Sequence, residues 1–303
     1  MIRPNYLKKG DKIGIISTAR KISKAELKAA IEEFESWDLD VILAKNLFKV
    51  QNQFAGNAKE RAEDLQFMLD NSEIKAIICA RGGYGSVQIV DLIDFSKFIK
   101  NPKWIVGYSD VTVLHSHINS NFNIETLHAI MPVNFKANSV QSDVQMLRKA
   151  LFGEDLVYKI PAHHFTNLQS DIKAEVVGGN LSIIYSLLGS KSDLKSKNKI
   201  LFIEELDEYL YHIDRMMMNI ERNGHLSDIE LLLVGGMTDM NDNKVPFGKN
   251  AKEIIKDFVE RNSLKAVFGF PAGHISPNNP IFMGREMRVW REENYIHFTQ
   301  SNE

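Results

Sequence analysis

The chain of 303 residues has a single cysteine, Cys79, which excludes an internal disulfide. It contains no apolar run near the ~20 residues that a membrane-spanning helix needs. Close to the N-terminus the apolar run covers only residues 13–16, and no small-residue cleavage site follows, so we expect no secretion signal. Together these absences predict a cytoplasmic protein that makes no contact with a membrane.

An excess of charge of one sign is also missing. The formal net charge is −2 and no long basic tract is present, so nucleic acid is not an expected partner. The metal-binding patterns H-E-x-x-H and C-x-x-C do not occur, and neither does the phosphate-binding ending G-K-[ST]. We therefore predict no metal and no cofactor, and a metallocarboxypeptidase is excluded for lack of ligands.

The residues that are present predict a globular protein with two α/β parts. Hydrophobic residues make up 44% of the chain, which supplies a core for one large or two medium domains. Up to residue 135, short apolar strands alternate with amphipathic helices, which indicates a parallel, doubly wound sheet. The predicted strands are 12–16, 40–44, 74–79 and 104–106, and the predicted helices are 23–37, 59–71 and one that begins at 87–92.

The composition changes after about residue 136. We place an N-terminal domain at 1–152, an irregular polar linker at 153–173, and a smaller, β-rich α/β domain at 174–303. In this last part the predicted strands are 174–177, 200–203, 230–234, 266–268, 287–290 and 295–298, and the predicted helices are 180–188, 211–223 and 251–261. Because ligands bind at the carboxyl ends of parallel strands, polar residues at those ends are the candidates for function.

Ser109 is the first such residue. In the segment KWIVGYSD (103–110) an apolar strand ends at a sharp turn before a helical pattern begins, which is the arrangement of a nucleophile elbow. The amide of the following residue, Asp110, then points to where an oxyanion forms. The alternative is that Ser109 or Asp110 simply caps the helix.

A second strand end carries the glycine-rich turn RGGYG (81–85). Its glycines allow the backbone to approach a ligand closely, so the turn is a candidate for an oxyanion-hole amide or for phosphate binding, and otherwise is a plain tight turn. Arg81 favours a functional role, because a guanidinium at this position suits capture of a carboxylate.

A base and an acid also follow apolar strands. His274 ends AVFGFPAGH and is the histidine best placed to accept a proton from a serine. Glu204 and Glu205 follow the strand LFI, and because side chains alternate along a strand only one of them faces the cleft. Among the other histidines, His128 follows a short strand and is a further candidate for the same cleft. The rest are expected to be structural or exposed, and His163 and His164 fall in the predicted linker.

Six motifs in one order resemble the serine LD-carboxypeptidase family, which includes muramoyltetrapeptide carboxypeptidases and microcin C immunity peptidases. The resemblance extends from about residue 11 to residue 288, and a set of six is far more specific than any one motif. The motifs are RGGYG (81–85), GYSDVTVLH (107–115), TLH (126–128), GGNLSIIYSLLGS (178–190), LFIEELDEYLYHIDRM (201–216) and GFPAGH (269–274).

The resemblance implies a Ser–Glu–His triad of Ser109, Glu204 and His274. It also implies an oxyanion hole made by the amides of Asp110 and Gly83. The fold it implies is a flavodoxin-like parallel-sheet N-terminal domain with a β-rich C-terminal domain, commonly as a homodimer. The assignment of Arg81 to the substrate carboxylate is an inference from residue type alone.

The function implied is a serine carboxypeptidase that releases the terminal D-alanine from cytoplasmic muropeptide tetrapeptides during peptidoglycan recycling. One alternative within the family is a microcin-C-immunity-type peptidase that cleaves peptidyl or aminoacyl nucleotides. An alternative of another class is a non-catalytic protein that binds a small anion at the Arg81 turn. In each case we expect a small peptide, muropeptide or anion as the ligand.

Overall fold

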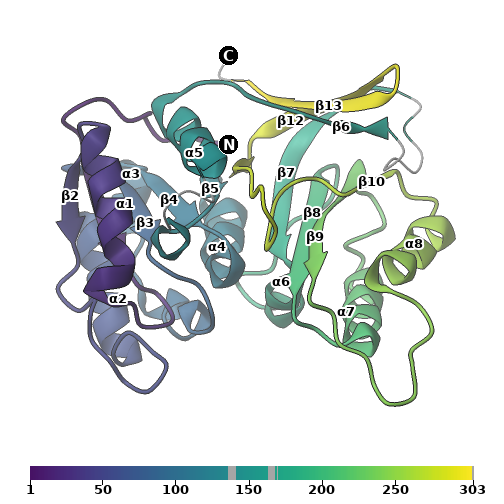
Figure 1. Ribbon diagram of the computed structural model, residues 1–303, viewed down its shortest axis with the longest axis horizontal. Coiled ribbons are helices and arrows are strands. Elements are labelled where there is room, and N and C mark those ends of the chain that lie inside the picture. The colour runs from purple at the N-terminus through teal and green to yellow at the C-terminus, as the bar shows by residue number, and fades with distance from the viewer. Residues whose placement is uncertain (136–140, 163–167, 169, 302–303) are drawn as a thin grey trace.

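The computed structural model of the protein describes residues 1–135, 141–162, 168 and 170–301, and it contains two β-sheets that lie side by side with helix α4 (Thr112–Phe122) between them (Figure 1). The first sheet has the order β11-β5-β4-β3-β1-β2. Its parallel strands β2-β1-β3-β4-β5 follow the flavodoxin order, and β11 is added antiparallel to β5. The strands are β1 (Lys12–Ile16), β2 (Asp40–Leu43), β3 (Ile74–Cys79), β4 (Trp104–Gly107), β5 (Thr126–His128) and β11 (Ile281–Met283).

The helices of this half begin where the sequence supplies caps. In α1 (Lys24–Ser36) the Ser23 hydroxyl accepts the amide of Glu26, and the Glu26 carboxylate accepts the amide of Ser23. Helix α2 (Ala58–Asp70) starts with a reciprocal pair of hydrogen bonds of the same kind. A short helix, α3 (Ser96–Lys100), precedes β4. The predicted helix at 87–92 is wrong, because two 3₁₀ turns, η1 (Ser86–Gln88) and η2 (Val90–Leu92), occupy this segment. Contacts to other parts of the chain fix this segment: the amide of Ser86 and the carbonyl of Gly85 are both bonded to distant side chains.

The second sheet has the order β10-β9-β8-β7-β12-β13-β6. Strands β7, β8, β9 and β10 run parallel, and β12, β13 and β6 extend the sheet in antiparallel fashion. This confirms the predicted mixed α/β class with a more β-rich second half. The strands are β6 (Leu156–Pro161), β7 (Ile172–Asn180), β8 (Ile200–Leu206), β9 (Leu231–Thr238), β10 (Ala266–Phe268), β12 (Glu286–Glu292) and β13 (Tyr295–Gln300).

Helices α6 (Leu181–Leu187), α7 (Leu210–Arg222) and α8 (Ala251–Arg261) belong to the second half, and α5 (Gln141–Phe152) lies near the top of the view between the halves (Figure 1). The buried faces of α7 and α8 pack together in one apolar cluster. A larger cluster is continuous from the first sheet into the second, since Trp104 and Phe202 both belong to it. The two halves are therefore joined by apolar packing, which fixes the strand ends of one sheet relative to those of the other.

Two strands cross the domain boundaries that the sequence suggests. Strand β6 lies inside the segment predicted as an irregular linker, and its alternating buried and exposed side chains pair with β13. Strand β11 comes from the C-terminal part of the chain but belongs to the first sheet. The boundary at 153–173 stays a prediction, and His163 and His164 lie outside the described residues. Among the described helices, none has the length and apolarity that crossing a membrane requires.

Candidate active site

Ser109 sits at the carboxyl end of β4, at the start of the 3₁₀ turn η3 (Ser109–Val111) that leads into α4. Its φ is +63°, a left-handed conformation that costs a non-glycine residue of order 1–3 kcal/mol. The serine is half-buried, while Tyr108 and Asp110 on either side of it are buried. The strand–turn–helix predicted from the sequence is thus present, with the backbone strain that is typical of a nucleophile elbow.

The glycine-rich turn lies directly against this serine. A Cβ atom placed on Gly82 would be 3.1 Å from Ser109 Oγ, so a side chain at this position would crowd the hydroxyl. The Asp110 carboxylate accepts the amide of Ser86 at 2.8 Å, which ties the serine turn to the end of the glycine-rich turn. In the described part of the chain, the N–H groups of Gly83 and Asp110 have no acceptor. Both N–H groups can therefore donate to a ligand, and their role as oxyanion-hole donors stays a prediction.

His274 and Glu204 meet at the ends of β10 and β8. His274 Nδ1 is 2.7 Å from Glu204 Oε2, and the backbone amide of His274 donates to the same oxygen at 3.2 Å. A Cβ on Gly273 would lie 2.7 Å from Glu204 Cβ, so only glycine lets the two segments approach this closely. In the neutral imidazole, a proton on Nδ1 that is donated to this carboxylate leaves Nε2 unprotonated, where it can act as a base.

The electrostatics of His274 follow from this contact. Burial by itself lowers the pKa of the imidazole, but the hydrogen bond and the charge of Glu204 outweigh it, and the pKa rises above its ordinary value of 6.5. The Glu204 side chain is fully buried, so its charge acts on His274 with little screening by water. The ring of Tyr108 packs on the imidazole with centroids 4.8 Å apart, which places the residue next to Ser109 against His274.

Glu205 points the other way and has different partners. Its carboxylate accepts the Asn180 side-chain amide at 2.9 Å and the Ser182 backbone amide at 2.6 Å, at the start of α6. The backbone amide of Asn180 donates to the Thr112 hydroxyl at 3.0 Å, and Thr112 is on the helix that follows Ser109. Of the two adjacent glutamates, only Glu204 contacts His274, and Glu205 fixes α6 and β7 against α4.

The loop that carries His274 is held by residues that the sequence did not indicate. The amide of Gly273 donates to Asn278 Oδ1 at 2.9 Å, and the amide of Asn278 donates to Asp143 Oδ2 at 3.0 Å. Asn278 and Asp143 are both buried. Asp143 belongs to α5, far away in the sequence, and no local pattern marks it. This chain of hydrogen bonds ties the loop that carries His274 to α5.

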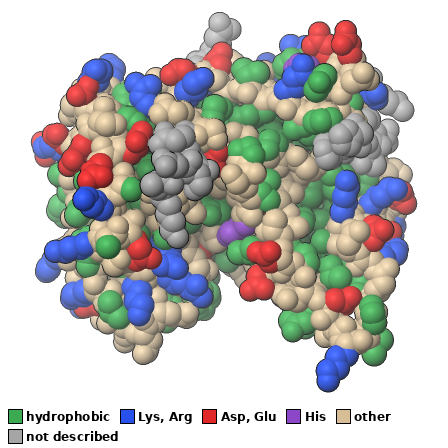
Figure 2. Space-filling model, viewed as in Figure 1, with side chains coloured by type: hydrophobic (Ala, Val, Ile, Leu, Met, Phe, Trp, Pro, Cys, Tyr) green, Lys and Arg blue, Asp and Glu red, His purple; other side chains and the backbone are tan. Residues whose placement is uncertain are grey.

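A pocket of about 430 Å³, which we call the His274 pocket, opens beside this histidine. Its walls combine apolar groups with a few hydrogen-bonding groups, as is typical of small-molecule sites. Figure 2 shows that this face of the molecule is hollowed between its two halves, with histidine atoms at the surface of the hollow. The pocket is lined by Tyr108, Ile130, Asn134, Asp143, Leu206, His274, Ile275, Ser276 and Asn278.

The remaining candidates from the sequence lie elsewhere. Arg81 is at the glycine-rich turn, where its Nη1 is 3.3 Å from Glu26 Oε1. His128 does not line the pocket: it is fully buried, and burial lowers the pKa of its imidazole well below the ordinary value. His115 is also buried, with both ring nitrogens bonded, to Thr126 and to the carbonyl of Gly107.

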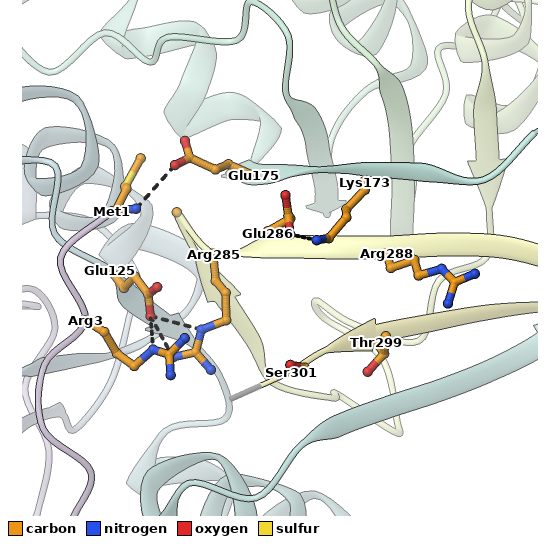
Figure 3. A pocket seen from close by; sticks show the side chains of 11 residues that line it. Met1, Arg3, Glu125, Lys173, Glu175, Arg285, Glu286, Arg288, Thr299 and Ser301 are labelled. Carbon is orange, nitrogen blue, oxygen red and sulfur yellow. Dashed lines mark hydrogen bonds and ion pairs between the residues drawn. The ribbon is translucent and has the colours of Figure 1, made fainter. Parts of the chain in front are cut away.

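A second pocket, of about 560 Å³, lies where the N-terminal segment meets β7 and β12, and we call it the Arg285 pocket (Figure 3). Figure 3 shows Arg3 and Arg285 directed at Glu125, and the amino group of Met1 directed at Glu175. It shares no lining residue with the His274 pocket. Its opposite charges are arranged in pairs, which indicates a structural junction between the two halves.

Comparison with known proteins finds one family over most of the chain. The sequence profile of the LD-carboxypeptidase N-terminal domain matches residues 13–129, and that of the LD-carboxypeptidase C-terminal domain matches residues 173–289. A probable murein peptide carboxypeptidase of Bacillus subtilis is 33% identical over 285 residues, which is 93% of this chain and 89% of that protein.

Solved structures show the same fold. The muramoyltetrapeptide carboxypeptidase of Oxalobacter formigenes superposes with a TM-score of 0.87 at 22% identity, covering 96% of this chain and 98% of the other. The microcin-immunity protein MccF, in complex with glutamyl sulfamoyl guanosine, gives the same TM-score at 19% identity and covers 100% and 99% of the two chains.

Proposed function

This chain belongs to the LD-carboxypeptidase family, and we propose that it is a serine carboxypeptidase that releases the terminal D-alanine from muropeptide tetrapeptides. Family membership makes it a peptidase, and the B. subtilis relative supports a murein peptide as the substrate class. The observation that carries the mechanism is the contact of His274 Nδ1 with the buried carboxylate of Glu204, beside the strained turn at Ser109.

In the proposed reaction Ser109 Oγ attacks the carbonyl carbon of the bond between the L-centre and the terminal D-residue. The hydroxyl proton passes to His274 Nε2, and Glu204 stabilises the imidazolium that forms. The negative charge that develops on the carbonyl oxygen is accepted by the amides of Gly83 and Asp110. Removing one such donor in comparable sites raises the barrier by about 3–4 kcal/mol.

The tetrahedral intermediate then breaks its carbon–nitrogen bond. The imidazolium of His274 gives its proton to the departing amine, which leaves as D-alanine, and the acyl group stays on Ser109. A water molecule, deprotonated by His274, attacks the acyl carbon; the bond to Ser109 Oγ breaks, His274 returns the proton to Oγ, and the shortened peptide leaves as a carboxylate. Arg81 is the candidate from sequence for the substrate carboxylate, although its pairing with Glu26 places a competing charge beside it.

The direct test is incubation with a muramoyl tetrapeptide and measurement of free D-alanine, with a chelator present to test dependence on metal. We expect release by the wild type and none by Ser109→Ala. A wild type that releases D-alanine from no tetrapeptide would contradict the proposed substrate. Release that continues in Ser109→Ala would instead contradict the proposed nucleophile.

A second candidate function is cleavage of a peptidyl or aminoacyl nucleotide, which the superposition on MccF over the whole chain favours. Such a substrate needs a surface on which a base can stack. The described lining of the His274 pocket offers the rings of Tyr108 and His274 but no tryptophan, and Trp37 and Trp104 are buried in the core. These features favour the muropeptide. Parallel assays with both substrate types separate the two functions.

A third candidate, of a different class, is a non-catalytic protein that binds a small anion at the Arg81 turn. An active-site serine probe distinguishes it from an enzyme, because labelling of Ser109 that is lost in His274→Ala requires an activated hydroxyl. We also propose a cytoplasmic location and a homodimer. Light scattering of the purified protein measures the second of these directly.

A further inference from the structure

Arg20 lies across the glycine-rich turn. A Cβ atom placed on Gly83 would be 2.6 Å from both Cγ and Cδ of Arg20 and 3.0 Å from its Nε, so the arginine side chain covers that glycine. The backbone amide of Arg20 is 3.4 Å from the carbonyl oxygen of Gly82, which holds the two segments together. The contact depends on glycine at position 83, because any side chain there would displace Arg20.

The charged group of Arg20 is available to a ligand. The residue is exposed, and within the described part of the chain its guanidinium has no carboxylate or ring partner. Arg81 differs in this respect, because its guanidinium already lies against Glu26, which also belongs to the capping box of α1. Between Arg20 and Arg81, Arg20 carries the charge that is not neutralised.

Arg20 contacts the residue that follows the one lying against Ser109. It covers Gly83, and a Cβ on the preceding residue, Gly82, would lie 3.1 Å from Ser109 Oγ. Consecutive Cα atoms are about 3.8 Å apart, so the arginine and the serine hydroxyl flank one turn at neighbouring positions. In a terminal residue only the Cα atom separates the scissile nitrogen from the carboxylate carbon. A substrate whose terminal residue extends from Ser109 along this turn would therefore bring its carboxylate to Arg20.

We propose that Arg20 binds the terminal carboxylate of the residue that is removed, and so determines that the enzyme cleaves only at a free carboxyl terminus. The inference rests on the proposed function of the site. A guanidinium donates two parallel hydrogen bonds to a carboxylate, a geometry that neither an amide nor an ester of the substrate reproduces. Arg20 is thus a specificity residue, and its position on Gly83 couples carboxylate binding to the turn that carries a proposed oxyanion donor.

The test compares two tetrapeptides, one ending in D-alanine and one ending in D-alaninamide. We expect the wild type to favour the free acid in kcat/KM, and Arg20→Gln to lose about 10- to 100-fold on the acid with little change on the amide. Arg20→Lys should recover part of the preference. Lys21→Gln, which removes a charge from the adjacent exposed position, should leave both values as in the wild type. An acid-to-amide ratio in Arg20→Gln equal to that of the wild type overturns the proposal.

Binding separates this inference from the proposed reaction. In a Ser109→Ala background, calorimetry with the same two peptides measures affinity without turnover. The role of Arg20 is supported if the acid binds more tightly than the amide and this difference disappears when Arg20→Gln is added. This holds even if the wild type hydrolyses neither peptide. Equal affinity for acid and amide overturns the role of Arg20 even if the wild type releases D-alanine. Arg81→Gln, measured in parallel, tests the competing assignment: a preference for the acid that is lost in Arg81→Gln but kept in Arg20→Gln overturns the role of Arg20.

Discussion

The His274 pocket and the Arg285 pocket differ in whether their buried polar groups have hydrogen-bond or ion-pair partners. In the Arg285 pocket the Arg285 guanidinium donates to Glu125 at 2.6 Å and 3.0 Å and stacks on the ring of Phe282, so both charges are compensated. Beside His274, Glu204 Oε1 and Asn278 Nδ2 are buried, and neither has a partner among the described residues.

Unpaired buried polar groups cost stability, and native proteins retain them mainly where function requires it. The buried imidazole of His128 belongs to the same neighbourhood: its ring lies 5.8 Å from that of Tyr108, and neither nitrogen has a described partner. The unpaired groups support the proposal that the first pocket carries the chemistry, whereas the paired charges of the second pocket join the two halves. Substitutions in the first should therefore reduce activity, and substitutions in the second should reduce stability.

The largest expected effect is that of Ser109→Ala. Removing the nucleophile of a triad lowers kcat by on the order of a million-fold in comparable enzymes. We expect D-alanine release to fall to that extent while the free energy of unfolding changes little, since the serine is only half-buried. Urea denaturation and the D-alanine assay on the same preparation measure the two quantities. Activity within tenfold of the wild type would falsify the assignment.

The adjacent glutamates offer a matched pair of substitutions. Glu204→Gln removes the negative charge beside His274 and puts an NH2 donor in place of one carboxylate oxygen, which favours the wrong imidazole tautomer, and we expect a loss of about ten-thousand-fold in kcat. Glu205→Gln should keep most of the activity at neutral to alkaline pH but lower the free energy of unfolding by about 1–3 kcal/mol, because its buried hydrogen bonds at α6 are lost. The reverse pattern would show that the two roles are exchanged.

A substitution in the Arg285 pocket should lower the free energy of unfolding without changing activity. Arg285→Met leaves the buried carboxylate of Glu125 without this partner, and breaking such a pair costs about 3–5 kcal/mol. Chemical denaturation measures the loss, and kcat/KM of the folded variant should match the wild type. The double variant Arg285→Met with Glu125→Leu should recover stability. A selective loss of kcat in the folded single variant would mean that this pocket takes part in the reaction.

A smaller effect is expected from the loop that holds His274. In Asn278→Ala the amide of Gly273 loses its acceptor, so the imidazole is less well positioned. Small misplacements of catalytic groups cost up to about a hundred-fold, and we expect a ten- to hundred-fold fall in kcat with KM nearly unchanged. Asn278→Asp preserves the acceptor oxygen and should retain more activity than alanine. Equal losses in the two variants would argue against this role of the side chain.

The smallest expected effect is a shift in the pH dependence of kcat/KM. His274 acts as a base only when neutral, and its raised pKa means that it stays protonated to a higher pH than an ordinary histidine. We therefore expect kcat/KM to fall with decreasing pH along a limb centred above pH 6.5. Glu205 also raises this pKa by its charge, so Glu205→Gln should move the limb to lower pH. A limb that moves to higher pH in this variant would contradict the assigned electrostatics.

Much of the fold could be predicted because its signals are local. The apolar runs that became β1 and β3, and the capping box of α1, lie within a few residues and appear in the structure where the pattern indicated. Strand β6 was missed because its partner, β13, is more than a hundred residues away, and an edge strand gains its stability from that pairing. The 3₁₀ turns after Gly85 were missed because bonds to Asp110 and Arg61 replace the helical pattern.

The chemical groups that stand at strand ends could be predicted from the amino-acid order alone: a serine at a sharp turn, a histidine after Pro-Ala-Gly, and a carboxylate after an apolar strand. This is possible because a strand, its end and the following turn are encoded in contiguous residues. Only the tertiary structure decided that Glu204 faces His274, that Asp143 and Asn278 hold the loop, and that Arg20 covers Gly83. Those contacts join segments that no local pattern relates, because they form only when two packed sheets bring their edges together.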